Sequence, residues 1–184
     1  HISVFLKAKA LEEEGKKIIH LEVGEPDFKP PEEVKTALAE VYDKGYGKYG
    51  SAKGIPELRK ALAESEEANV EFCDGRCTEE NIMICPGARF AVYLAITTLL
   101  NPGDEIIVIE PAWPAYKDCA LNAGIKVRTI KTTLETKWEP SVEQINNAIN
   151  ENTKMIILNY PNNPTGKILS NELLDSIIQT AKEH

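Results

Sequence analysis

The chain has 184 residues, of which 42% are hydrophobic and 27% charged, and its formal net charge at pH 7 is −8. This length and balance are typical of a globular protein with one domain and an appended piece. The acidic charge argues against nucleic acid as a partner, because phosphate backbones select basic surfaces. No stretch reaches the roughly 18 apolar residues of a membrane span, and no signal-peptide pattern opens the sequence, so we expect no membrane partner either.

The first part of the sequence predicts helices separated by a short strand and a glycine-rich link. Ser3 is suited to cap the first helix and Gly15 to end it. Pro31 opens the next helix, where its missing N–H costs nothing. The predicted elements are a helix over 3–14, a strand over 18–23, a helix over 31–44, a glycine-rich link over 45–54 and a helix over 56–68.

From residue 81 onward, the apolar periodicity alternates between strand and helix. The predicted strands are 81–85, 105–109, 126–130 and 155–159, and the predicted helices are 88–100, 114–123, 141–150 and 170–183. This alternation predicts an α/β fold with three layers, α/β/α, around a mostly parallel sheet. We expect the sheet to be incomplete, because the chain stops inside its last helix, where such a pattern would normally lead into another strand.

Three predicted strands end in loops with unusual chemistry, and the first of these loops is Cys85-Pro86-Gly87-Ala88-Arg89. Gly87 and Ala88 would let a ligand approach the backbone at the start of a helix, and Arg89 adds a positive charge. The free N–H groups of a helix start favour anions, so this segment predicts an anion site, most naturally for a phosphate. The alternative is an ordinary helix start that happens to carry one arginine.

The second loop, Glu110-Pro-Ala-Trp113-Pro-Ala-Tyr116, holds an indole between two prolines. A tryptophan that is held rigidly at the end of a strand can stack on a flat aromatic ligand. The alternative is a core tryptophan that packs beneath the loop.

The third loop, Asn159-Tyr-Pro-Asn-Asn163-Pro-Thr-Gly166, offers the amide of Asn163 as donor and acceptor. A cis Asn163-Pro164 bond would fix this amide in space. A plain turn is the alternative, because Asn-Pro dipeptides mark turns. Since ligands of open α/β sheets bind at the carboxyl ends of the strands, the three loops together predict a flat, heteroaromatic and phosphorylated ligand.

The four cysteines predict neither a disulfide nor a metal site. Cys73 and Cys77 are separated by three residues, a wider spacing than in most zinc sites, and no second pair follows them. Cys85 and Cys119 fall in predicted regular elements. We expect reduced packing residues, which points to the cytoplasm.

The chain resembles the N-terminal half of a fold-type I, pyridoxal-phosphate-dependent aminotransferase of the aspartate aminotransferase superfamily (class I/II). The likeness runs from about Ser3 to the last residue, and its motifs stand in family order. These motifs are Leu21-Glu-Val-Gly24-Glu-Pro-Asp-Phe28, Tyr49-x₄-Gly54-Ile-Pro-Glu-Leu-Arg59, Pro86-Gly87-Ala88-Arg89, Asn101-Pro-Gly-Asp104, Pro111-Ala-Trp113-Pro-x-Tyr116 and Asn159-Tyr-Pro-Asn-Asn163-Pro-Thr-Gly166. Each is modest alone, but the whole set in order is highly specific.

The resemblance implies the cofactor pyridoxal 5'-phosphate (PLP) and assigns residues to it. Gly87, Ala88 and Arg89 would bind the phosphate together with the helix N-terminus. Trp113 would stack on the pyridine ring. Asn163 would donate to the phenolic oxygen of the ring.

The resemblance also implies substrate and partner contacts. Gly24, Trp113 and Asn163 would line the site for the substrate, an amino acid or 2-oxo acid, with Gly24 leaving room for its carboxylate. Tyr49 would reach the phosphate bound in the partner subunit, so that a homodimer shares its active sites. No metal is implied.

The chain departs from the family in what it lacks. The Schiff-base lysine of the family stands in an [ST]-x-x-K motif, and no such motif occurs in these 184 residues. The resemblance therefore implies no catalytic residue in this chain, and that lysine is expected beyond residue 184. By the same likeness, residues 1–30 would contribute a helix, a strand and a substrate loop to a small domain. Residues 31–184 would form the N-terminal part of a PLP-binding large domain.

The implied activity is transfer of an amino group between an L-amino acid and a 2-oxo acid, with the 184-residue chain inactive on its own. One alternative is a PLP-dependent lyase on the same fold, of the β C–S lyase or aminocyclopropane-carboxylate synthase kind. Another is the sensing domain of an aminotransferase-like transcription regulator. The acidic helix ahead of Leu21 disfavours the regulator, which would need a basic winged-helix region there.

Overall fold

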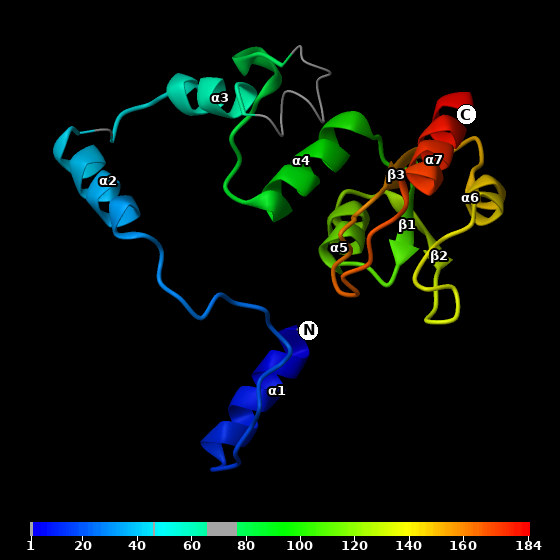
Figure 1. Ribbon diagram of the computed structural model, residues 1–184, viewed down its shortest axis with the longest axis horizontal. Helices are drawn as coiled ribbons and strands as arrows, with labels where there is room; N and C mark the ends of the chain where they lie inside the picture. Colours follow the sequence, from blue (N-terminus) through cyan, green and yellow to red (C-terminus); the bar gives the residue numbers. More distant parts are fainter. Residues whose placement is uncertain (1, 46, 66–76) are drawn as a thin grey trace. The chain divides into compact units, whose positions relative to one another are not determined.

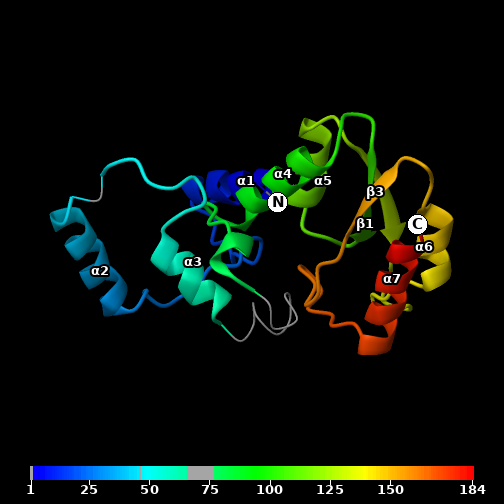
Figure 2. The ribbon, with the colours of Figure 1, turned by 90° about the horizontal axis from the view of Figure 1, so that it is seen from above.

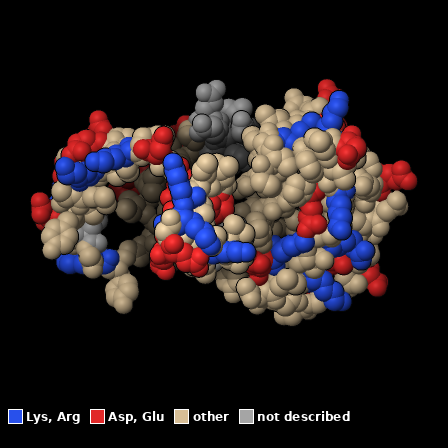
Figure 3. Space-filling view, turned by 90° about the horizontal axis from the view of Figure 1, so that it is seen from below, with Lys and Arg blue, Asp and Glu red and all other residues tan. Residues whose placement is uncertain are grey.

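The computed structural model describes residues 2–45, 47–65 and 77–184 (Figure 1). Contacts group the chain into two compact units, residues 1–50 and residues 51–184. Among the described residues, every helix falls short of the length and apolar content that a bilayer crossing requires. Lys and Arg side chains lie interspersed with Asp and Glu on the face seen in Figure 3.

The described residues of the unit 1–50 form two helices, as the periodicity predicts. α1 spans Ile2–Glu13 and α2 spans Glu32–Asp43. Gly15 follows α1 with a φ of 84°, a left-handed conformation that glycine adopts without steric cost. Pro31 precedes α2 as its N-cap residue.

The prediction of a strand over 18–23 is wrong. Residues 16–21 have no regular structure, and the Leu21 side chain is 90% exposed. A strand needs a neighbour to satisfy its backbone, and the described part of this unit offers none. Polar contacts hold the segment instead, because the His20 ring bridges Glu12 at 2.8 Å and Glu22 at 2.6 Å.

In the unit 51–184, the segment before the sheet differs from the sequence prediction. α3 spans Pro56–Ala63 and is therefore shorter than expected, while residues 66–68 of the predicted helix lie outside the described residues. The strand expected over 81–85 is wrong, because a 3₁₀ turn, η2, spans Glu79–Asn81 and residues 82–85 extend without pairing into a sheet. A capping box between Thr78 and Asn81 turns the backbone at this point.

The sheet is parallel and has the order β2-β1-β3, which confirms the predicted α/β class. Its strands are β1 (Glu105–Glu110), β2 (Lys126–Lys131) and β3 (Thr153–Ile157). β1 pairs with β2 in continuous register, from Glu105 opposite Lys126 to Glu110 opposite Lys131. The apolar run of β1 is buried throughout, as expected for a central strand that is covered on both faces.

Helices cover both faces of the sheet, so the three predicted layers are present (Figure 2). α4 (Ala88–Leu99) and α5 (Ala115–Asn122) lie on one side, and α6 (Val142–Ala148) and α7 (Asn171–Glu183) on the other. The core of the first side consists of Ile96, Leu100, Ile106, Val108, Tyr116, Cys119, Ala120 and Ile125. The core of the second side consists of Ile107, Ile109, Ile130, Ile145, Ala148, Leu169 and Ile177.

The described cysteines of the sheet unit include a core residue. Cys119 is buried in α5, where burial raises the pKa of its thiol, and Cys85 is half-buried. Cys73, which the sequence analysis also considered, lies outside the described residues.

A polar network ties the three strands together at their amino ends. Glu105 of β1 is 8% exposed, and its Oε1 accepts hydrogen bonds from Arg128 Nε at 2.8 Å and Asn150 Nδ2 at 2.6 Å. Thr153 of β3 donates to the same oxygen at 3.2 Å. The bond from the Arg128 guanidinium is the main reason that the pKa of the Glu105 carboxyl lies below its usual range.

Candidate active site

The candidate site lies at the opposite edge of the sheet, where β1 and β3 end. Because the two strands are parallel, the loops that follow them leave the sheet at the same edge. These are the loops predicted to carry Trp113 and Asn163. The N-terminus of α4, which carries Gly87, Ala88 and Arg89, contributes the third segment.

The start of α4 suits an anion. Gly87 has a φ of 91°, and a Cβ built on it would meet no atom within 4 Å, so open space lies beside the backbone here. No side chain caps α4, and its first turn, Ala88-Arg89-Phe90-Ala91, carries no carboxylate. The first N–H groups of a helix have no intrahelical partner, and they carry the positive end of the helix dipole. These uncapped donors, with the exposed side chain of Arg89, fit a phosphate.

Arg89 and Trp113 lie together. The guanidinium carbon of Arg89 is 5.2 Å from the centroid of the indole ring, within the range of a cation–π contact. Tyr116 meets the same ring edge-on, with centroids 5.5 Å apart. Trp113 is half-buried and packs against the core between β1 and α5, so it is partly a core residue and partly an exposed aromatic surface.

The Asn163 loop is joined to the Trp113 loop by a neighbour that the sequence analysis did not single out. Asn162 is 9% exposed, and its Nδ2 donates to the Pro111 carbonyl oxygen at 3.2 Å. Its Oδ1 accepts from the backbone N–H of Thr165 at 3.1 Å and from the Thr165 hydroxyl at 2.8 Å. An asparagine with a threonine three residues later is a sequence signal for such a local turn, but not for the bond to Pro111.

Asn163 itself keeps its side chain exposed. Its backbone N–H donates to Asn159 Oδ1 at 3.0 Å. The peptide bond between Asn163 and Pro164 is cis, as are the Glu110–Pro111 and Tyr160–Pro161 bonds. The amide of Asn163 is therefore accessible at the edge of the sheet where Trp113 lies.

Two lysines near these motifs form ion pairs with glutamates. Lys167 Nζ lies 2.6 Å from Glu139 Oε1, and Lys53 Nζ lies 2.5 Å from Glu80 Oε2. Both lysines are thus paired with carboxylates.

Gly24 and Tyr49 belong to the other compact unit, 1–50. The side chain of Tyr49 is fully exposed, and a Cβ built on Gly24 would meet no atom within 4 Å. Their roles toward the substrate and toward a partner subunit stay predictions.

Replacing Asn162 by alanine should loosen both loops. The change leaves the Pro111 carbonyl and the Thr165 donors without their buried partner, which should cost about 1–3 kcal/mol of unfolding free energy. Urea unfolding of the full-length protein measures this loss. Asn147→Ala, an exposed change inside α6, is the matched control and should be neutral within about 0.5 kcal/mol. Equal unfolding midpoints for the two variants would show that the hydrogen bonds of Asn162 do not stabilise the two loops.

The comparisons with known proteins agree with one another. The family model "Aminotransferase class I and II" matches residues 16–184. The aspartate aminotransferase of Musicola paradisiaca is 37% identical over 180 residues, which are 97% of this chain and 44% of that protein. The aspartate/prephenate aminotransferase of Thermus thermophilus is 36% identical over 183 residues, which are 100% of this chain and 47% of that protein.

Solved structures give the same result. Aspartate aminotransferase from Thermus thermophilus with maleate matches with a TM-score of 0.90 and 37% identity, covering 100% of this chain and 47% of that one. Alanine aminotransferase from Pyrococcus furiosus matches with a TM-score of 0.89 and 35% identity, covering 98% and 46%. The chain spans about half the length of the curated relatives that it matches. It therefore belongs to the class I and II aminotransferases, a PLP-dependent family of fold type I.

Proposed function

We propose that the protein containing this chain is a PLP-dependent aminotransferase that moves an amino group between an L-amino acid and a 2-oxo acid. The observation that carries the proposal is the pairing of Arg89 with Trp113 at 5.2 Å, beside the uncapped start of α4. A cation, free N–H donors and an aromatic face in one place match a ligand that combines a phosphate with a flat ring.

The residues of this chain would hold the cofactor rather than perform the proton transfer. Gly87, Ala88 and Arg89 would bind the phosphate through backbone N–H groups and the guanidinium. Trp113 would lie against the pyridine ring and exclude water from its face. Asn163 would offer its amide to the ring oxygen and to the substrate carboxylate.

When bound, PLP supplies an electron sink that stabilises negative charge developing at the substrate Cα. The chain's part in this is to fix the ring and phosphate, so that the reacting carbon meets a base in a constant geometry. We place that base, the family's lysine, outside residues 1–184, because the chain contains no [ST]-x-x-K motif.

We propose a cytoplasmic homodimer in which Tyr49 reaches the phosphate of the partner subunit, and the full exposure of Tyr49 supports this role. Gly24 would leave room for the substrate carboxylate. We also propose that residues 1–30 contribute to a small domain and that residues 31–184 form the N-terminal part of the PLP-binding large domain.

Incubating the full-length protein with PLP, 2-oxoglutarate and a panel of amino acids should yield glutamate. The reason is that a transaminase returns the amino group to a 2-oxo acid, whereas a lyase releases it as ammonia. Glutamate and ammonia are measured in the same reactions, and the isolated 184-residue chain serves as a control that should form neither. Ammonia and pyruvate without glutamate would favour the lyase and contradict the proposal.

A further inference from the structure

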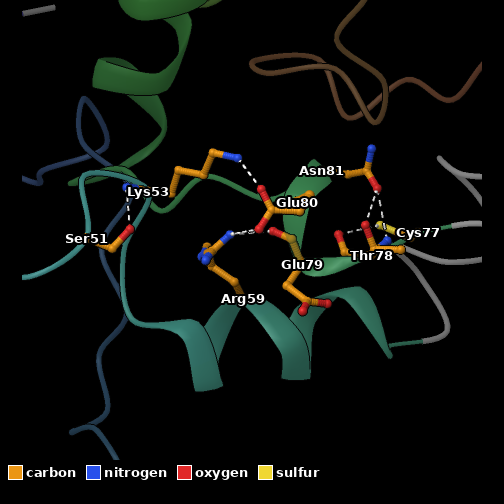
Figure 4. A network of polar contacts seen from close by, with 8 residues as sticks. All are labelled: Ser51, Lys53, Arg59, Cys77, Thr78, Glu79, Glu80 and Asn81. Atoms are coloured by element: carbon orange, nitrogen blue, oxygen red, sulfur yellow. Dashed lines mark hydrogen bonds and ion pairs between the residues drawn. The ribbon is translucent and has the colours of Figure 1, made fainter.

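A cluster of charged residues lies beside the segment that leads into α4 (Figure 4). The Glu80 cluster, as we name it, consists of Glu80 with two cations, Lys53 and Arg59. Lys53 Nζ lies 2.5 Å from Glu80 Oε2, and Arg59 Nη1 lies 3.5 Å from Glu80 Oε1. Arg59 Nη1 also donates to the backbone carbonyl of Glu79 at 2.7 Å.

Arg59 anchors this cluster to α3. Its side chain is only 8% exposed, although it carries a charge, and its Nε is buried without a hydrogen-bond partner in the described part of the chain. A buried guanidinium needs compensation, and the Glu79 carbonyl and Glu80 carboxylate supply it. The bond from Lys53, together with the two positive charges, lowers the pKa of the Glu80 carboxyl. Glu80 thus joins its own segment, residues 79–84, to residues 53–59.

A second contact joins residues 79–84 to residues 53–59. The backbone N–H of Ile84 donates to the Lys53 carbonyl at 2.9 Å. Gly54 has a φ of 100°, and a Cβ built on it would lie 2.6 Å from both Cβ and Cγ1 of Ile84. Only glycine fits at position 54, because a side chain would collide with Ile84 and would also oppose the backbone conformation.

The held segment leads directly to the proposed phosphate site. Ile84 is followed by Cys85, whose carbonyl accepts from the N–H of Gly87 at 2.7 Å, and α4 begins at Ala88. We propose that the Glu80 cluster and Gly54 position the N-terminus of α4, and so set the affinity for the phosphate of the cofactor. This inference rests on the proposed function, and its members are positioning residues that do not touch the ligand.

Two residues of one sequence motif have no role in the proposed site, yet both lie against the segment that leads into α4. Gly54 and Arg59 both belong to the sequence motif that begins at Tyr49, yet neither is assigned to a ligand. In the structure, both of them hold residues 79–84. Lys53 stands four residues after Tyr49, so the same cluster also fixes the end of the glycine-rich link.

The test compares PLP with pyridoxal, which has the same ring but no phosphate. Full-length apoprotein is titrated with each compound by absorbance, for wild type, Glu80→Gln and Glu64→Gln. Glu64 is the matched control, because it forms an exposed pair with Lys60 at 3.9 Å at the end of α3. The preference for PLP over pyridoxal should fall about fivefold in Glu80→Gln, the equivalent of one net hydrogen bond, and stay unchanged in Glu64→Gln.

Two further variants make the result specific. Glu80→Asp keeps the charge and should restore most of the preference for PLP. Gly54→Ala should lower the preference as Glu80→Gln does, because the added Cβ would collide with Ile84 and displace the segment that leads into α4.

Three outcomes would overturn the inference, and they can be told apart. An unchanged preference in Glu80→Gln would show that the cluster does not set the phosphate site. An equal loss of affinity for both compounds, with a lower melting temperature, would show a role in stability alone. A wild-type protein that binds neither compound would overturn the proposed function and this inference with it.

Discussion

Replacing Arg89 by alanine should lower the affinity of the full-length protein for PLP by about one to two orders of magnitude. A hydrogen bond to a charged group contributes about 1.5–3 kcal/mol, which corresponds to that loss. The guanidinium lies over Trp113 at the start of α4, where helix N–H groups alone would remain to bind the phosphate. Absorbance titration of the apoprotein measures the change.

Two matched variants separate charge from ring contact. Arg89→Lys keeps the positive charge without the planar donors, so its affinity should fall between those of wild type and Arg89→Ala. Trp113→Ala should weaken PLP and pyridoxal alike, because it removes a contact to the ring. If Arg89→Ala and Trp113→Ala bind PLP as tightly as wild type, the pocket lies elsewhere.

Replacing Glu105 by alanine should lower the free energy of unfolding by about 2–3 kcal/mol. The change removes a nearly buried carboxylate that accepts from Arg128, Asn150 and Thr153, and it leaves the amide and hydroxyl without their acceptor. Arg128 is partly exposed and can be solvated again, which limits the loss. Urea unfolding of the full-length protein, followed by circular dichroism, measures the effect.

The pH dependence distinguishes the charge of Glu105 from its packing. Because folding lowers the pKa of this carboxyl, its stabilising contribution is complete above the unfolded pKa of about 4.3. The contribution is lost as the pH falls from there through the lower pKa of the folded state. Glu105→Gln keeps an acceptor but cannot titrate, so its stability should fall less steeply over this acidic range. Parallel stability curves for wild type and Glu105→Gln would contradict this assignment.

The fold was predictable wherever the pattern of the sequence is local. β1, β2 and β3 were predicted to within two residues at each end, because each is a short apolar or alternating run between clear turn signals. The helices that cover them follow from apolar spacing. In the structure, the side chains of Ser141 and Ser170 cap α6 and α7 by accepting from the first turn.

The errors have a common physical cause. Residues 18–23 and 81–85 have the composition of strands, but a strand forms only if a distant segment supplies its hydrogen bonds. The first segment is held instead by His20 and its carboxylates. Among the described residues, the second has one backbone bond to a distant segment, from the Ile84 N–H to the Lys53 carbonyl. No local pattern reports whether such a partner exists.

The candidate site was predictable to a similar degree. That the Trp113 and Asn163 loops share one edge followed from their place after β1 and β3, since the carboxyl ends of parallel strands meet at the same edge. The contact of Arg89 with Trp113 did not follow in this way, because the strand expected before Arg89 does not form. The hydrogen bond by which Asn162 connects the two loops could not be predicted either, because its partner Pro111 lies far away in the sequence. The Glu80 cluster was missed for the same reason.

The position of the Glu105 network has a consequence for how this protein can evolve. β1 has six residues, so Glu105 and the loop after Glu110 are separated by about 16 Å along the strand. Substitutions that far apart usually have additive effects on stability. A mutation that improves the bonding around Glu105 can therefore compensate for a destabilising change in the Trp113 or Asn163 loops, without altering what those loops recognise. Divergence in substrate preference should thus be accompanied by stabilising changes at the amino edge of the sheet, and reconstructed ancestral sequences would reveal the order in which the two arose.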